Sequence, residues 1–124
     1  MDFGQLHHLE YYVEDLKKSN EFWDWFMPFL GYTKSAEWGS GVSWKQKNGT
    51  YICFVELEEA SKREVNSRQG VGLNHVAFMG GSMAELDQLE KDLIKKNINI
   101  LKRDGEYLCF EDVNLFAIEV YAKA

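Results

Sequence analysis

Apolar residues follow two different spacings along this chain, and the two spacings occur twice in the same order. Around Leu9 apolar and polar residues alternate, which is typical of a strand with one buried face, and the segment around Val76 is β-like but largely apolar at both parities. Each of these segments is followed by apolar residues at helical spacing. The helical stripes are Leu16, Phe22, Phe26 and Leu30, then Leu86, Leu89, Leu93 and Ile94. The pattern therefore predicts two amphipathic helices, each preceded by a strand.

The two halves also resemble each other directly in sequence. The residues around His8 match those around His75 at an offset of 75 − 8 = 67, and the same offset aligns Asp15 with Ser82. A short side-chain oxygen at either position can accept a hydrogen bond from the first turn of a helix, so both residues are predicted helix N-caps. The chain is therefore predicted to contain one structural unit twice.

Three short β-like segments follow each predicted helix. They cover residues 33–38, 42–47 and 51–57, then 98–102, 106–110 and 115–121. Asn48-Gly49 and Asp104-Gly105 predict tight hairpins between neighbouring segments. The sequence predicts a single α+β domain over 1–124, built from two tandem βαβββ modules. Module one covers about 1–57, a polar linker about 58–71, and module two about 72–124.

Strand parity selects a group of polar residues that could share one site. Neighbouring side chains in a strand point to opposite faces, so the apolar parity identifies the face packed on a helix. This argument places His8 and Glu119 on the faces away from the helices, and the repeat places His75 like His8. In the strand ending module one, Cys53, Val55 and Leu57 form the helix-packed face, and the opposite face carries Ile52, Phe54 and Glu56, so Glu56 joins His8. His8, Glu56, His75 and Glu119 are thus predicted to face one concavity.

Two chemical roles are open for these four residues. Imidazole and carboxylate ligands in this mixture suit a divalent metal such as Ni, Co, Mn, Fe or Zn and leave positions for substrate. An isolated histidine at the start of a strand is more often a hydrogen-bonded core residue. The two carboxylates favour the metal, because an unpaired carboxylate in an apolar cup is costly.

The bulk composition restricts the partners. The chain has 124 residues and a net charge of −6, which disfavours nucleic acid and anionic membranes as partners. No apolar run approaches the length of a membrane-spanning helix and no signal peptide is evident, so a cytoplasmic location is expected. Cys53 and Cys109 lie in separate apolar runs, which suits reduced thiols.

With these features in place, the whole chain resembles the vicinal oxygen chelate superfamily, which includes glyoxalase I, bleomycin-resistance proteins and extradiol dioxygenases. The matching phrases are Leu6-His7-His8-Leu9-Glu10-Tyr11, Phe29-Leu30-Gly31-Tyr32, Gly72-Leu73-Asn74-His75-Val76 and Ile118-Glu119-Val120. The resemblance implies a cupped mixed sheet with helices on its outer face. It also implies a central metal held by His8, Glu56, His75 and Glu119.

The resemblance to bacterial glyoxalase I implies a lactoylglutathione lyase-type isomerisation of a glutathione or other thiol adduct. In that scheme Glu119 or Glu56 moves the proton while the metal polarises the substrate. Two features depart from the family pattern. Glu111-Asp112-Val113-Asn114 replaces the usual Asp-Pro-Asp-Gly turn, and only Arg63 and Arg68 could meet the carboxylates of glutathione.

Two other functions fit the same fold. A bleomycin-resistance-type protein would bind a cationic small molecule without metal, using the negative charge and the aromatic residues Tyr12, Trp38, Trp44 and Tyr121. A fosfomycin-type thiol transferase would need more cations than the chain offers. The strand edges that two four-stranded sheets expose also predict a homodimer, which the family resemblance implies as well.

Overall fold

The computed structural model describes residues 3–62 and 69–123. The chain divides into two compact units, Met1–Arg63 and Glu64–Ala124, and the boundary falls inside the predicted linker. Residues 63–68, which include the two arginines considered for glutathione, lie outside the described residues.

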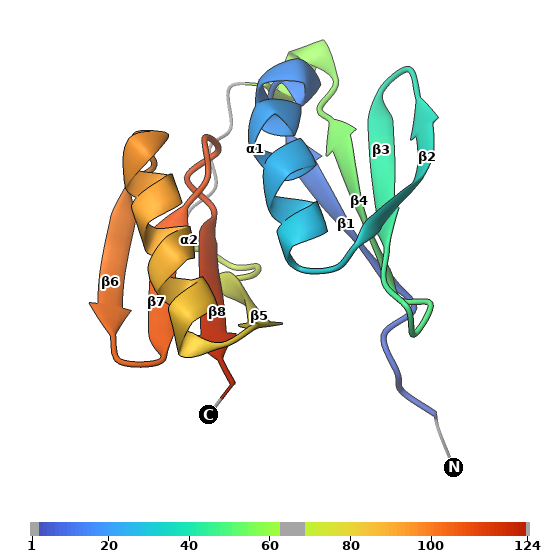
Figure 1. Ribbon diagram of the computed structural model, residues 1–124. Helices are drawn as coiled ribbons and strands as arrows, with labels where there is room; N and C mark the ends of the chain where they lie inside the picture. The colour runs from blue at the N-terminus through green and yellow to red at the C-terminus, as the bar shows by residue number, and fades with distance from the viewer. Residues whose placement is uncertain (1–2, 63–68, 124) are drawn as a thin grey trace. The chain divides into compact units, whose positions relative to one another are not determined.

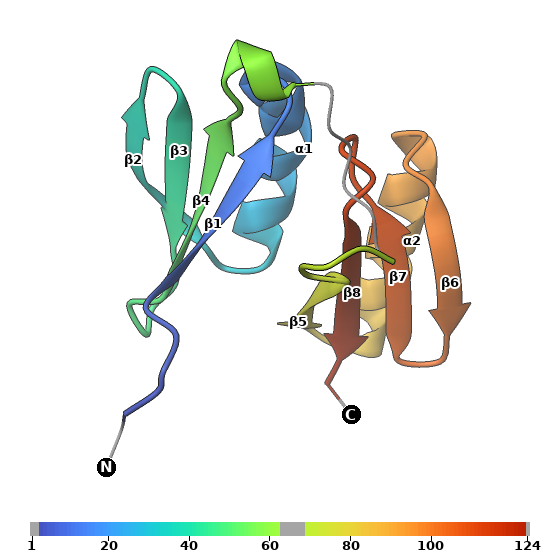
Figure 2. The same ribbon diagram turned by 180° about the vertical axis from the view of Figure 1, so that it is seen from behind.

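The first unit is a four-stranded sheet with one helix on one face (Figure 1). Its elements are β1 (His8–Val13), α1 (Leu16–Phe29), β2 (Thr33–Trp38), β3 (Gly41–Lys45) and β4 (Tyr51–Glu56), followed by the short 3-10 helix η1 (Glu59–Ser61). The strand order is β1-β4-β3-β2, visible from behind in Figure 2. Strand β1 runs parallel to β4, and the other neighbours are antiparallel.

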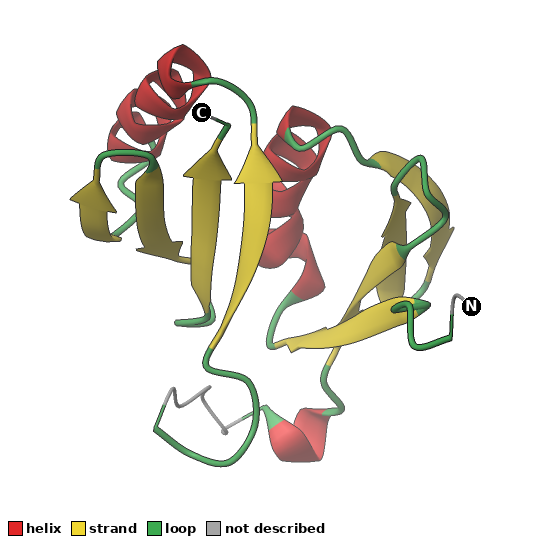
Figure 3. Ribbon diagram, turned by 90° about the horizontal axis from the view of Figure 1, so that it is seen from below, coloured by secondary structure: helices red, strands yellow, loops and turns green. Residues whose placement is uncertain are grey.

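The second unit repeats this topology. Its elements are β5 (His75–Gly80), α2 (Met83–Lys95), β6 (Ile100–Asp104), β7 (Tyr107–Glu111) and β8 (Ala117–Ala122). The strand order β5-β8-β7-β6 corresponds to that of the first unit, again with one parallel pair. Each unit thus has one long helix and one four-stranded sheet, coloured red and yellow in Figure 3. The predicted α+β fold with two tandem βαβββ modules is therefore confirmed.

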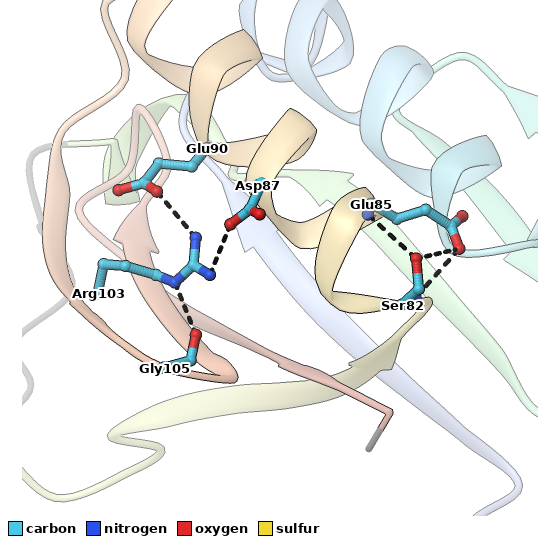
Figure 4. Close-up of polar contacts among 6 residues, drawn as sticks. All are labelled: Ser82, Glu85, Asp87, Glu90, Arg103 and Gly105. Carbon is cyan, nitrogen blue, oxygen red and sulfur yellow. Dashed lines mark hydrogen bonds and ion pairs between the residues drawn. The ribbon is translucent and has the colours of Figure 1, made fainter.

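Both helices begin at the predicted caps. The Asp15 carboxylate accepts a hydrogen bond from the Lys18 N–H, and the Ser82 hydroxyl accepts one from the Glu85 N–H. The Glu85 carboxylate in turn accepts a hydrogen bond from the Ser82 N–H, which completes a capping box (Figure 4). Helix α1 ends just before Gly31, whose φ of +88° lies in the left-handed region that favours glycine at a helix end.

Each helix packs on its sheet through most of its predicted apolar stripe, but Ile94, predicted to belong to the second stripe, is 60% exposed. In the first unit Trp23 stacks on Phe54 of β4 with ring centroids 4.2 Å apart, and both residues are buried. In the second unit Leu86, Leu89 and Leu93 are buried on the α2 face that lies against β8. The residues of each sheet that face away from the helix are left to form a second, more polar surface.

An arginine fixes helix α2 relative to the β6–β7 hairpin. The Arg103 guanidinium donates hydrogen bonds to Asp87 and Glu90 on the helix, each at 2.8 Å, and to the Gly105 carbonyl at the turn (Figure 4). The Arg103 side chain is only 18% exposed, so these bonds are partly shielded from water. This network holds the hairpin that carries β7 into the candidate site.

None of the helices in residues 3–62 and 69–123 is long and apolar enough to cross a membrane.

Candidate metal centre

The face of each sheet that points away from its helix, which we call the open face, carries the candidate site residues. On β5, His75, Ala77 and Met79 are exposed, whereas Val76 and Phe78 are half-buried toward the helix. The strand register then defines one row across the open face of the second unit, namely Ala77, Glu119, Cys109 and Lys102. His75 and Glu119 thus lie on adjacent strands of the same face.

The two predicted residues of module two are in direct contact. The Nε2 atom of His75 is 3.3 Å from Oε2 of Glu119. The Glu119 side chain is 12% exposed and that of His75 38% exposed, so the carboxylate lies deeper than the ring. The other ring nitrogen of His75, Nδ1, donates a hydrogen bond to the Asn74 side-chain oxygen at 2.8 Å. The imidazole of His75 is therefore fixed by Asn74 at Nδ1, and its Nε2 atom faces the Glu119 carboxylate.

Two tyrosine hydroxyls donate hydrogen bonds to the Glu119 carboxylate, one to each oxygen. Tyr107 of β7 donates to Oε2 and Tyr121 of β8 donates to Oε1, each at 3.2 Å. Burial raises the pKa of the Tyr107 phenol, and the neighbouring Cys109 and Glu119 raise it further, so Tyr107 stays a donor. Sequence reasoning missed Tyr107, although its parity with Cys109 on β7 places it on the open face.

His8 occupies the corresponding place in the first unit. Its ring stacks on Tyr51 with centroids 4.6 Å apart and planes 3° from parallel. Its Nδ1 atom lies 2.8 Å from Nδ1 of His7. The prediction that His8 starts a strand like His75 is confirmed by the topology, because each begins the edge strand paired in parallel with the last strand of its unit.

Glu56 does not lie on the open face, so its predicted orientation was wrong. Phe54, two residues earlier on β4, packs on Trp23 of α1, and Glu56 follows the same parity toward the helix. Its Oε1 accepts a hydrogen bond from the Leu16 N–H at 2.9 Å, and its Oε2 pairs with Lys62 at 3.2 Å. Both carboxylate oxygens are therefore used at the start of helix α1.

The register explains the error. Glu119 is opposite Ala77, two residues after His75, whereas the residue opposite Glu10, two residues after His8, is Cys53. The counterpart of Glu119 is thus Cys53, at an offset of 119 − 53 = 66, and not Glu56, at an offset of 63. In the first unit the exposed carboxylate beside this position belongs to Glu10 on β1, which pairs with Cys53 on the neighbouring strand β4.

Glu56 supplies a pH-dependent contribution to stability. The Leu16 N–H, followed by Lys62, holds the pKa of the Glu56 carboxyl below its ordinary value. A depressed folded-state pKa stabilises the fold above the unfolded-state pKa, and this contribution is lost as the pH falls through the folded-state pKa.

We therefore expect Glu56→Gln to lower the free energy of unfolding at neutral pH and to have little effect at strongly acidic pH. Urea titrations of both proteins from neutral to acidic pH test this. A difference that stays constant across the whole series would contradict the assignment. Glu58→Gln serves as a matched control, since no hydrogen bond or ion pair of the Glu58 side chain is found in residues 3–62 and 69–123.

The donor set of the second unit fits a divalent metal. Ligand atoms about 2.1 Å from one metal lie about 3.0 Å apart at a right angle and about 3.4 Å apart at the tetrahedral angle. The 3.3 Å between His75 Nε2 and Glu119 Oε2 falls within that interval. Across residues 3–62 and 69–123, three or more His, Cys, Asp or Glu side chains do not gather at one ready-made metal site. The pair therefore provides two ligands of a shell that needs more.

Known proteins share this fold over nearly the whole chain. No protein-family model matches the sequence. An uncharacterised protein, YqjT, from Bacillus subtilis is 38% identical, covering 94% of this chain and 98% of its own length. A glyoxalase-like protein of Bacillus halodurans has a crystal structure with a TM-score of 0.90 and 33% identity, covering 98% of this chain and 97% of its own. The chain belongs to the glyoxalase-type proteins of the vicinal oxygen chelate superfamily.

A more distant relative illustrates a metal in the same fold. The fosfomycin resistance protein FosX of Listeria monocytogenes is 19% identical, with a TM-score of 0.70, and covers 98% of this chain and 94% of its own. The chain compared is a glutamate-to-glutamine mutant of that protein, crystallised with Mn(II) and 1S,2S-dihydroxypropylphosphonic acid. At this identity the likeness shows the fold alone.

Proposed function

We propose that this protein is a metal-dependent glyoxalase-like enzyme that isomerises a small-molecule substrate, in the manner of a lactoylglutathione lyase acting on a thiol adduct. The observation that carries the proposal is the pair formed by His75 Nε2 and Glu119 Oε2 on the open face of the second unit. A Ni, Co, Mn, Fe or Zn ion is the proposed cofactor.

The contact between His75 Nε2 and Glu119 Oε2 becomes favourable with either a proton on Nε2 or a metal ion between the two atoms. The Asn74 side-chain oxygen accepts a hydrogen bond from Nδ1–H of His75, so in the neutral ring Nε2 presents its lone pair to a carboxylate oxygen. A proton on Nε2 would make the contact an ion pair, and charge-assisted N–H···O bonds are usually about 2.7–2.9 Å long. The observed 3.3 Å is compatible with a long ion pair and with two ligands of one metal, and we propose the metal.

The sequence also assigned His8 and Glu56 to the metal, and that assignment stays a prediction. No hydrogen bond from residues 3–62 and 69–123 reaches Nε2 of His8, which is available as a ligand atom. The oxygens of Glu56 are engaged by the Leu16 N–H and Lys62, so its participation would cost those contacts. We therefore propose His75 and Glu119 as the ligands of module two and His8 as the ligand of module one.

The chain itself supplies orientation and a proton acceptor. A bound metal would act as a Lewis acid on substrate oxygens. Glu119 is the proposed catalytic carboxylate, which accepts a proton from one carbon and returns it to its neighbour. Tyr107 and Tyr121 fix both of its oxygens, so the carboxylate is positioned before substrate arrives.

The test is an assay with hemithioacetals formed from a 2-oxoaldehyde and either glutathione or other small thiols. We expect turnover in protein loaded with Ni, Co, Mn or Zn and none after chelation. Turnover that survives complete metal removal would contradict the proposed mechanism.

We also propose a homodimer, because β1 and β5 are each at the edge of their own sheet and an exposed strand edge can pair with another chain. Light scattering on the same sample tests this prediction.

A metal-free binding protein is the second candidate, favoured by the exposed aromatic rings on an acidic chain. Tyr12, Trp38 and Tyr121 are 59%, 45% and 38% exposed, and such rings can contact a cationic ligand. Trp44, predicted to join them, is instead buried under Lys34. Tight binding of a cationic aromatic molecule, with no metal uptake and no turnover, would support this candidate and contradict the first.

A further inference from the structure

The residue immediately before each module's strand histidine binds the same ring nitrogen of that histidine. Asn74 Oδ1 lies 2.8 Å from Nδ1 of His75, and His7 Nδ1 lies 2.8 Å from Nδ1 of His8. The two contacts have the same sequence separation, the same distance and the same ring atom, although the residues providing them differ. A contact that recurs in both modules with different chemistry points to a shared requirement on the histidine.

The module-two contact determines which nitrogen of His75 carries the proton. An amide oxygen can only accept a hydrogen bond, so Nδ1 of His75 must be the donor. In the neutral ring the lone pair then lies on Nε2, the atom that faces Glu119. A neutral histidine side chain in water prefers the opposite tautomer, with its proton on Nε2. Asn74 therefore reverses the intrinsic preference of the ring.

The module-one contact can do the same. Nδ1 of a neutral His7 accepts a hydrogen bond when His7 carries its own proton on Nε2. His7 is exposed, so water can satisfy that Nε2–H group. With His7 as acceptor, His8 donates from Nδ1 and keeps its Nε2 lone pair, as His75 does. The parallel stacking of His8 on Tyr51 further restricts the ring.

We propose that Asn74 and His7 are positioning residues that fix His75 and His8 in the Nδ1–H tautomer and so leave both Nε2 lone pairs available to a cation. The role of these lone pairs as metal ligands rests on the proposed function, but the tautomer does not. A partner on the second nitrogen of a metal-binding histidine orients the ring, and its loss typically costs about 10–100-fold in metal affinity.

The chain offers a direct test, because it contains only three histidines, His7, His8 and His75. Long-range proton–nitrogen NMR on the metal-free protein, labelled with ¹⁵N-histidine and kept above the ordinary histidine pKa of about 6.5, reads each ring's tautomer directly. We expect the Nδ1–H form at His8 and His75. The Nε2–H form at His75 in the native protein would overturn the proposal.

Four variants separate positioning from a general loss of structure. Asn74→Ala should move His75 toward the Nε2–H form, and Asn74→Asp, which keeps an acceptor, should restore Nδ1–H. His7→Phe should move His8 in the same way, whereas His7→Asn copies module two and should preserve its tautomer. If Asn74→Ala or His7→Phe leaves the corresponding tautomer unchanged, the residue does not have this role.

Asn99→Ala is the matched control. It removes an asparagine amide that lies just before β6, three strands from β5 in the sheet order, and that bonds Glu111 at 2.8 Å. Its His75 tautomer should equal that of the native protein. A Co(II) titration of the same proteins should then show about 10–100-fold weaker binding for Asn74→Ala than for Asn99→Ala. If none of the proteins binds Co(II) while the tautomers respond as expected, the proposed function fails and the positioning role stands.

Discussion

Glu119→Gln is expected to lower kcat for hemithioacetal isomerisation by about 10²–10⁴-fold, the usual contribution of a positioned general acid or base. The amide keeps the size of the carboxylate but has only one oxygen and cannot accept the substrate proton. Tyr107 and Tyr121 would lose one of their two acceptor oxygens. Substrate binding should be less affected than turnover, so KM should change much less than kcat.

Steady-state kinetics on metal-loaded protein measures this effect. Glu106→Gln is a suitable control, because it removes a carboxylate from the β6–β7 turn and not from the open face. Its kcat should equal that of the native protein. A native-like kcat in Glu119→Gln, with metal bound, would show that another group transfers the proton.

Phe54→Ala is expected to cost about 3–5 kcal/mol of unfolding free energy, the usual effect of removing a buried aromatic ring. Phe54 is fully buried, stacks on Trp23 at 4.2 Å and contacts Tyr11 with ring centroids 5.3 Å apart. Its loss leaves a cavity between β4 and α1. Because total stabilities of domains are about 5–15 kcal/mol, this single change removes a large part of the total.

Urea unfolding followed by tryptophan fluorescence is the appropriate measurement, since Trp23 reports on this core. Val113→Ala removes an exposed side chain and should change the stability by at most about 0.5 kcal/mol. Equal midpoints for Phe54→Ala and Val113→Ala would contradict the packing described for the first unit.

The sequence was sufficient for the order of helices and strands along the chain, because each element depends on local signals. Helix caps at Asp15 and Ser82, the glycine turns and the apolar stripes all act within a few residues. The repeat supplied the parity of β5, which hydrophobicity alone left ambiguous. The placement of His75 and Glu119 on one face followed from these signals.

The site could not be completed in the same way, because its remaining contacts depend on register. Both parities of β4 are apolar, and the set containing Cys53 was wrongly predicted to face the helix, whereas Phe54 packs on α1 and Glu56 has the same parity. The first N–H groups of a helix have no partner within the helix, and the Leu16 N–H finds one in the Glu56 carboxylate. This hydrogen bond forms only when the start of α1 and the end of β4 come together in the fold. Tyr107 meets Glu119 through the pairing of β7 with β8, which no local pattern specifies.

The most direct test of the central claim is metal stoichiometry, measured by elemental analysis of native and His75→Ala protein purified without a histidine tag. After reconstitution with Mn, Co, Ni or Zn and removal of free ion, we expect about one metal per native chain and almost none in the variant. Native protein should also melt higher with metal, since a ligand at 100 times its Kd stabilises by about 2.7 kcal/mol. Equal metal content in the native and His75→Ala proteins would contradict the assignment of His75 and Glu119 as a metal centre.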